Sequence, residues 1–187
     1  PYGNRVPQFS FEVVRPAQGA LIDAVPDLTR GINGVALIPG TGEYALATTP
    51  VHFAQGIGSN VSVNIHSPLG KTDFASAIGA LDEELPNCGS VSLVVSWFGS
   101  DLRCGNCTVR PKVESRTYDG VPMAWRAGGI TRAAADEVAR LLGRPVYGGT
   151  PADGAVVEAI KALRAGGKHV LFYPFVLMDQ LAGNGRA

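Results

Sequence analysis

Two aspartates and a tryptophan stand where an α/β enzyme would carry its chemistry. Asp101 follows an apolar run that ends at Phe98, and Asp179 follows a second apolar run that ends near Met178. In a parallel barrel both carboxylates would lie on the carboxyl-terminal rim, where active sites form. Paired carboxylates hydrolyse glycosides, one as acid and the other as base or nucleophile, and Trp97 could offer a flat face to a sugar. The competing interpretation is that both aspartates are solvated loop or capping residues and that Trp97 belongs to the core.

Cys104 and Cys107 form a CxxC pair, which can be half of a zinc site or a redox couple. Zinc needs four ligands, and the sequence offers no second pair and no HxxxH-type partner, so we predict no metal. A redox couple normally lies at a helix amino terminus, but the residues that follow, TVRP, are poor helix formers. We therefore favour a local disulfide or two plain thiols, and a thiol oxidoreductase stays open as a distant alternative.

Two further patterns could carry chemistry and are better explained without it. Gly40, Gly42 and Ala45 match the dinucleotide-binding fingerprint, but Pro50 leaves no room for a substantial helix and no acidic residue stands about 20 positions on. We predict a turn there and no cofactor. The histidines are scattered, without a recognisable nucleophile beside them, and we interpret them as ordinary polar or packing residues: His52, His66 and His169.

The elements that must position these residues begin as strands. Alternating apolar side chains predict a strand over residues 6–14, and shorter strands over 34–39 and 61–65. No long helical pattern separates them, which indicates a small β-rich module.

Helix-and-strand units follow. Thr72 or Asp73 begins a helix that ends before Pro86, and the β-branched run 91–98 predicts a strand covered on both faces. A second helix is predicted from Thr131 to Gly143, with its inward face made by three residues: Val138, Leu141 and Leu142.

The third helix has the clearest signals. Thr150 is predicted to cap it, Pro151 to occupy its first position, and Gly166 to end it. Its buried face is predicted from the apolar spacing: Val156, Val157, Ile160 and Leu163. The apolar strand 170–178 comes next, and we expect Pro174 to end or bulge its pairing.

Strands 91–98 and 170–178 are predicted to be parallel neighbours, because a helical crossover lies between them. The predicted fold class is therefore α/β: an amino-terminal β-rich hub segment, residues 1–60, followed by the first βα units of an incomplete TIM-like barrel, residues 61–187. A full barrel takes about 250 residues and eight strands, whereas two good barrel strands are visible. The chain also starts at Pro1 rather than at Met, so we expect it to be part of a longer polypeptide.

Composition narrows the function classes. The 187 residues carry 16 Lys plus Arg against 16 Asp plus Glu, so we expect no nucleic-acid binding through bulk charge. With 45% hydrophobic and 17% charged residues the chain is typical of a globular protein. No apolar stretch approaches the roughly 20 residues of a membrane span, and we expect neither a transmembrane segment nor a signal peptide.

Several segments together resemble one family. They are SVSLVVSWFGSDLRCGNCTVRP, RPVYGGTPADGAVVEAIKAL and FYPFVLMD. These are similar to the start of the glycoside-hydrolase-like TIM-barrel domain in the large host-specificity, or baseplate megatron, protein of gene transfer agents and related phage tails. The segment YGNRVPQFSFEVV similarly resembles part of phage tail-tip and hub proteins.

The resemblance implies a structural protein of a virion or phage-like particle tail. Such a protein would be assembled in the bacterial cytoplasm with other tail and baseplate subunits, as a homotrimer, and would meet a bacterial envelope glycan through its barrel. Catalytic acids of related barrels commonly lie on later strands, so no catalytic residue is carried over to this chain. An active glycoside hydrolase that degrades envelope polysaccharide is the alternative.

Overall fold

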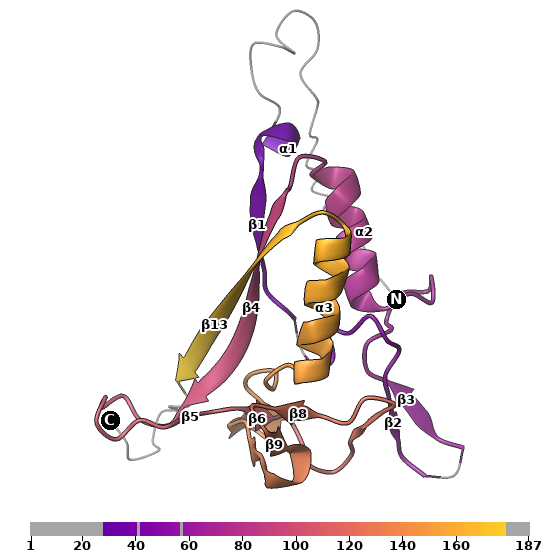
Figure 1. Cartoon of the computed structure of the whole chain (residues 1–187). Helices are drawn as coiled ribbons and strands as arrows, with labels where there is room; N and C mark the ends of the chain where they lie inside the picture. The colour runs from indigo at the N-terminus through magenta and orange to yellow at the C-terminus, as the bar shows by residue number, and fades with distance from the viewer. Residues whose placement is uncertain (1–27, 41, 57, 179–187) are drawn as a thin grey trace, which may run out of the picture.

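The computed structural model describes residues 28–40, 42–56 and 58–178. The predicted strand at 6–14 and the carboxylate of Asp179 lie outside them. The described chain is an α/β protein built on three parallel strands, in the order β1 (Gly34–Leu37), β4 (Ser90–Gly99) and β13 (His169–Met178). Figure 1 shows these strands side by side, with two helices next to them.

The pairing of β4 with β13 confirms the predicted parallel neighbours. It runs without a break from His169 opposite Ser90 to Met178 opposite Gly99. The expected interruption at Pro174 is wrong. Because the ladder with β4 continues past this proline, its missing N–H falls on the far side of β13, where the described sheet has no further strand.

Strand β1 extends the same sheet on its other side. Gly34 pairs with Ser90 and Leu37 with Leu93, again in parallel. The sequence placed this strand in the amino-terminal β-rich module, but the pairing puts it in the main sheet. The sheet therefore holds three parallel strands rather than two, while the rest of the proposed division at residue 60 stays a prediction.

Two of the three predicted helices are confirmed. The helix α2 (Asp73–Glu84) lies between β1 and β4 in the chain, and α3 (Asp153–Ala165) lies between β4 and β13. Thr72 begins α2 as predicted, since its hydroxyl accepts a hydrogen bond from the Ala75 N–H at 3.3 Å. The remaining helix, α1 (Leu28–Gly31), is a single turn.

The details of α3 differ from the prediction. Its N-cap is Ala152, which makes no side-chain bond, while the Thr150 hydroxyl instead accepts from the Lys112 N–H at 3.1 Å. Val157 is 47% exposed, because it lies outside the face of α3 that packs inward. The buried side chains of α3 are Ala155, Val156, Ala159 and Leu163.

The helix predicted from Thr131 to Gly143 is wrong. A short 3₁₀ turn, Arg132–Ala134, is followed by extended pieces, and Leu142 is 95% exposed. Tertiary pairing explains the difference: β10 (Asp136–Glu137) lies parallel to β6 (Lys112–Val113), and the Val138 N–H donates to the Val113 carbonyl at 2.9 Å. Only Val138 of the three predicted inward residues is buried.

The other strands are short and belong to the two long connections, residues 38–72 and 100–152. One small sheet joins the connections, because β2 (His52–Ala54) pairs with both β3 (Asn60–Ser62) and β7 (Gly120–Val121). The remaining pieces are β5 (Val109–Arg110), β8 (Arg126–Ala127), β9 (Ile130–Thr131), β11 (Arg140–Leu141) and β12 (Arg144–Pro145). The predicted strand at 61–65 is thus shorter and begins at Asn60.

The two faces of the main sheet differ. Alternate residues of β4, namely Val91, Leu93 and Val95, belong to the hydrophobic core together with residues of both long helices. The opposite face carries an open apolar hollow lined by six residues: Ala36, Ile38, Ser92, Val94, Tyr173 and Phe175. The prediction that strand 91–98 is covered on both faces therefore holds fully only on the helical side.

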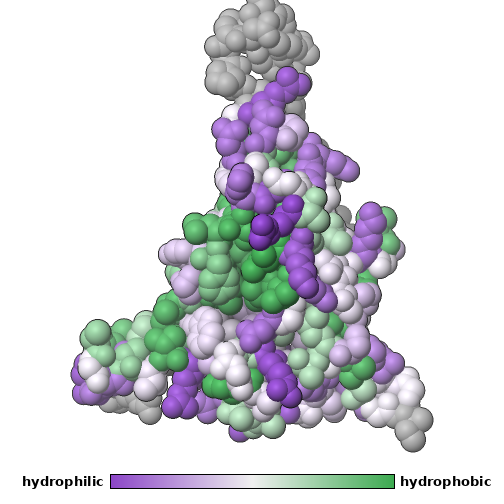
Figure 2. Space-filling model, viewed as in Figure 1, coloured by the Kyte–Doolittle hydropathy of each residue, from purple (hydrophilic) through white to green (hydrophobic). Residues whose placement is uncertain are grey.

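Strand β13 exposes apolar side chains on both of its faces. The exposed fraction is 63% for Leu171 and 48% for Phe172, which are neighbours and so point to opposite sides. Figure 2 shows hydrophobic residues gathered over this strand.

Within the described part of the chain, no helix has the length and hydropathy of a membrane span.

The position of the core predicts a contrast between two leucines of neighbouring strands. Leu93 is fully buried, so Leu93→Ala leaves a cavity and should lower the free energy of unfolding by about 2–5 kcal/mol. Leu171→Ala, at an exposed position, should change it by roughly 0.5 kcal/mol or less. Urea unfolding of the two variants measures the contrast. Equal losses would contradict a core confined to the helical face.

Candidate functional site

The two long connections follow the carboxyl ends of β1 and β4. In parallel α/β sheets these ends meet at one edge, and ligands bind in the crevice outside it. Figure 1 shows the labelled small strands of both connections, such as β2, β6 and β8, along the lower end of the molecule, the end at which β4 and β13 finish. The candidate site lies here, between residues 42–66 of the first connection and 114–132 of the second.

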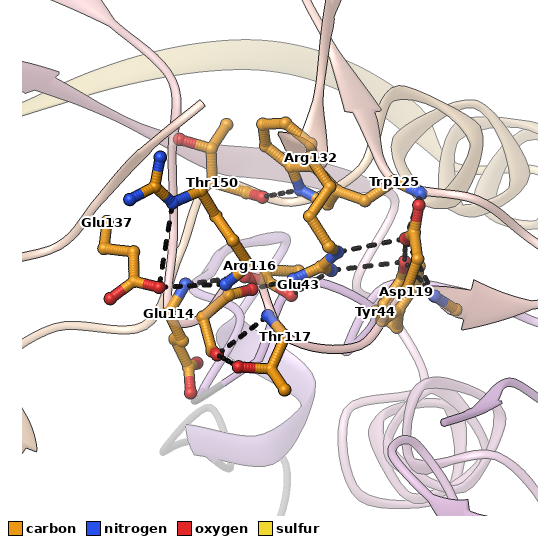
Figure 3. A network of polar contacts seen from close by, with 12 residues as sticks. Glu43, Tyr44, Glu114, Arg116, Thr117, Asp119, Trp125, Arg132, Glu137 and Thr150 are labelled. Atoms are coloured by element: carbon orange, nitrogen blue, oxygen red, sulfur yellow. Dashed lines mark hydrogen bonds and ion pairs between the residues drawn. The ribbon is translucent and has the colours of Figure 1, made fainter. Parts of the chain in front are cut away.

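A buried arginine joins the two connections. Nη2 of Arg132 lies 2.6 Å from Oε2 of Glu43, which comes from the first connection, and Nε lies 3.0 Å from Oδ1 of Asp119, which comes from the second. Nη1 donates to the Ser115 carbonyl at 2.6 Å, and Nη2 also reaches the Tyr44 hydroxyl at 3.3 Å. Figure 3 shows Glu43, Tyr44 and Asp119 around the guanidinium of Arg132. We call this set the Arg132 hub.

Aromatic rings complete the surroundings of this cation. The guanidinium carbon is 5.6–5.9 Å from three ring centroids, those of Tyr44, Phe53 and Trp125. Ring faces at this distance attract a cation, and more strongly where water is excluded. Arg132 itself is 4% exposed, so its charge is neutralised inside the protein rather than by solvent.

The anionic partners are held by further bonds. Oδ1 of Asp119 accepts from the N–H groups of Gly120 and Trp125, both at 2.8 Å. Burial raises the pKa of Asp119, but these bonds and Arg132 outweigh burial and hold the pKa below its ordinary value. A side chain at Gly120 would collide with the Tyr44 hydroxyl, which explains the glycine.

A cavity of about 290 Å³ opens above the hub. Its floor is made by the buried side chains of Glu43, Tyr44 and Arg132, and exposed residues such as His66 and Tyr118 stand at its rim. Both connections contribute to its walls. The full lining is Gly42, Glu43, Tyr44, Phe53, Ser62, Val63, His66, Glu114, Ser115, Tyr118 and Arg132.

Glu114 is the carboxyl of this cavity that the hub does not neutralise. Its backbone N–H donates to Oε1 of Glu43 at 2.7 Å, but its own side-chain Oε1 is buried and finds no hydrogen-bond partner among the described residues. Burial and then the charge of Glu43 raise the pKa of Glu114, and these effects outweigh a bond from Gly149 and the charge of Arg132. The cavity therefore holds a carboxyl that keeps its proton to a higher pH than an ordinary glutamate does.

The residues singled out from the sequence lie elsewhere. Asp101 is on the connection after β4, as expected, and makes a two-point ion pair with Arg103, whose Nη2 lies 2.7 Å from Oδ2 and whose Nε lies 3.0 Å from Oδ1. Trp97 is half-buried and packs against the core, with its ring against the backbone of Gly128. Neither residue lines the cavity, and their role in binding stays a prediction.

The CxxC pair lies in a turn without a following helix. The N–H groups of Asn106 and Cys107 both donate to the Arg103 carbonyl, and the two thiols are free, with Cys104 exposed and Cys107 half-buried. In the described residues no group of three or more His, Cys, Asp or Glu is arranged to hold a metal ion.

Sequence reasoning missed the residues of the hub and cavity. Glu43 stands in the connection after β1, the same rim position that singled out Asp101, and would have been found if residues 34–37 had been assigned to the parallel sheet. Arg132 carried no such signal, because 89 residues separate it from Glu43.

Comparisons with known proteins leave the family of this chain open. The chain matches no protein-family model and no curated protein sequence. Its function is therefore inferred from the fold and from the cavity.

The hub predicts a large effect of one arginine. Arg132→Met removes the cation and leaves the carboxylate of Glu43 buried without compensation, so the free energy of unfolding should fall by about 3–5 kcal/mol. Arg116→Met, which removes an exposed arginine 3.9 Å from Glu137, should lower it by less than about 1 kcal/mol. Urea unfolding at neutral pH measures both.

A second substitution tests whether the uncompensated charge of Glu43 causes this loss of stability. Glu43→Gln in the Arg132→Met background removes the uncompensated charge and should recover part of the lost stability. An Arg132→Met variant as stable as Arg116→Met would show that the hub does not hold the two connections together.

The raised pKa of Glu114 predicts a pH effect. A carboxyl with a higher pKa in the folded than in the unfolded chain binds its proton more tightly when folded. It therefore supports folding below its ordinary pKa of 4.5, and this support is lost as the pH rises through the raised value. Glu114→Gln cannot ionise, so it should be more stable than the parent chain above that value. Thermal unfolding across a pH series measures the difference, which should shrink in acid.

Glu158→Gln is the matched control and should behave in the opposite way. Burial raises the pKa of Glu158, but hydrogen bonds from Thr49 and Thr48 outweigh burial and lower it. Its stabilising contribution is therefore present above pH 4.5 and lost as the pH falls through the lowered value, so this variant should lose stability at neutral pH. The same pH response in both variants would contradict the two assignments.

Proposed function

We propose that this chain is part of a tail-tip or baseplate protein of a phage-like particle, of the gene transfer agent host-specificity type, and that it contacts the bacterial envelope through a carbohydrate-directed barrel. Three parallel strands lie in chain order across the sheet, with a long helix in each crossover. This is the repeating unit of a TIM barrel. The motif resemblance and this order support the same assignment.

The two faces of the sheet support a barrel rather than an isolated sheet. In a TIM barrel the helices cover the outer face, and side chains fill the interior. Here α2 and α3 cover one face, while Ile38, Val94, Tyr173 and Phe175 stand on the other. In the barrel these residues form part of the packed interior, and β13 gains a further strand beside it.

The position of the cavity is the observation that carries the carbohydrate-directed role. Barrel enzymes and binding proteins place their sites at the carboxyl ends of the strands, and the cavity is built entirely from the connections that follow β1 and β4. It combines carboxyl groups, hydroxyl groups and aromatic rings, which can hydrogen-bond a sugar and cover its apolar face. The proposed partners are the other tail and baseplate subunits, with a homotrimer as the assembly and the particle tail as the location.

An active glycoside hydrolase is the second candidate. The observation that favours it is Glu114, a cavity carboxyl whose pKa is raised by burial, which is the direction of shift that a general acid needs. Glu43 is a poor nucleophile in this scheme, because Arg132 and the Glu114 N–H occupy its oxygens. Asp101, on the same connection as Glu114, is one of the two carboxylates that the sequence predicts for the rim, and the other is Asp179.

Binding by the intact protein tests the proposed function. The full-length protein should bind purified envelope polysaccharide, and should co-purify with tail subunits from assembled particles. Isothermal titration calorimetry and mass spectrometry of the particles measure the two properties. An intact protein that does neither overturns the proposal.

Hydrolysis is tested separately, by product release from the same polysaccharide. If the protein is an active hydrolase that uses this face, Glu114→Gln or Asp101→Asn should lower the rate at least about 100-fold, since general acid catalysis contributes that much. Unchanged rates in both variants would remove these two carboxyls from the reaction.

A further inference from the structure

The charge balance of the cavity limits what it can bind. Among the described lining residues Arg132 is the one Lys or Arg, and its guanidinium already meets Glu43, Asp119, Tyr44 and the Ser115 carbonyl. It therefore has little attraction left for a ligand anion. The two carboxyl groups of the lining, by contrast, belong to Glu43 and Glu114, and Glu114 has no cationic side chain paired with it in the described ion pairs.

The charged groups around Glu114 do not reverse this balance. Arg140 donates to the backbone carbonyl of Glu114 at 2.7 Å, but its side chain lies 3.6 Å from the carboxylate of Glu137. At the rim, Nδ1 of His66 lies 2.7 Å from a carboxylate oxygen of Asp73. The side chains of Arg132, Arg140 and His66 thus each already lie beside a carboxylate, and an incoming anion would meet uncompensated negative charge when Glu114 is ionised.

The remaining polar groups suit an uncharged ligand. The rim and walls present the hydroxyl groups of Ser62, Ser115 and Tyr118, and the ring of Phe53 supplies an apolar surface. The volume of about 290 Å³ is at the small end of ligand cavities, so it fits one ring rather than a long segment.

We propose that this cavity is a subsite for a single uncharged sugar ring, and that Glu114 gives it selectivity against anionic sugars such as uronic acids. The inference rests on the proposed function, which supplies the saccharide class. It adds the position of the subsite, the charge of the sugar and the residue that sets the preference. Tyr118, 41% exposed at the rim, is the side chain that covers the bound ring.

Affinity for two matched oligosaccharides tests the proposal. The full-length protein is titrated, at mildly alkaline pH, with a neutral oligosaccharide and with a uronic acid oligosaccharide of the same length. The parent protein should prefer the neutral one. Tyr118→Ala should weaken neutral binding about tenfold, the effect of one good contact. Tyr147→Ala, which changes a tyrosine of similar exposure on the same connection but outside the cavity lining, should leave it unchanged.

The ratio of the two affinities tests whether Glu114 sets the preference for the neutral oligosaccharide. Glu114→Gln should raise the ratio of the uronic acid affinity to the neutral affinity about fivefold, because one negative charge is removed a few ångströms from the ligand. Glu84→Gln, the same change at an exposed position of α2 outside the cavity lining, should shift neither affinity. A structural role alone would not change the ratio of the two affinities, and unfolding temperatures of all four variants check that they fold.

The outcomes separate the two proposals. If the protein binds no saccharide at all, the proposed function fails, and the subsite fails with it. If it binds saccharides but Tyr118→Ala and Tyr147→Ala behave alike, the function stands and the subsite is overturned. Equal affinity of the parent protein for both probes, or an unchanged ratio in Glu114→Gln, overturns the charge selectivity.

Discussion

The neutralisation of one buried guanidinium organises the edge at which the parallel strands of the main sheet end. Arg132 lies on the second connection, and its partners Glu43 and Tyr44 lie on the first. The hydrogen bonds therefore fix against each other two long segments whose strands are only short. Short strands of two or three residues bury too little apolar surface to order such segments on their own. A buried charge tolerates few arrangements, because any displacement leaves it unpaired. Glu43, Tyr44 and Arg132, which form the floor of the cavity, are therefore held in fixed positions.

The carboxyl groups at the cavity have two different roles: some hold Arg132 in place, and one is left to interact with a ligand. The carboxylates of Glu43 and Asp119 are occupied in holding the cation, so they shape the floor and are poorly placed to bind or react. Glu114 meets Glu43 through its backbone N–H, and its side chain takes no part in neutralising Arg132. An arginine that is saturated internally thus gives an acidic cavity, although the chain as a whole has zero net charge.

The parts of the fold that the sequence predicted are those with strong local signals. The β-branched run of β4, the apolar run of β13 and the cap at Thr72 each specify their element without help from distant residues. The helix predicted over residues 131–143 is wrong because its apolar stripe is weak. Backbone pairing with β6 is more favourable than a helix there. The cavity could be placed at the carboxyl edge in principle, but its residues could not, since a bond between positions 89 residues apart leaves no local pattern.

Pro174 has a consequence beyond the register of the sheet. A strand with exposed apolar residues on both faces, as β13 has, is a template for aggregation if its outer edge offers a continuous row of N–H donors. The proline interrupts that row near the middle of the strand while leaving the ladder to β4 intact. The outer edge of β13 therefore lacks the continuous row of donors onto which a second copy of the chain could add a strand.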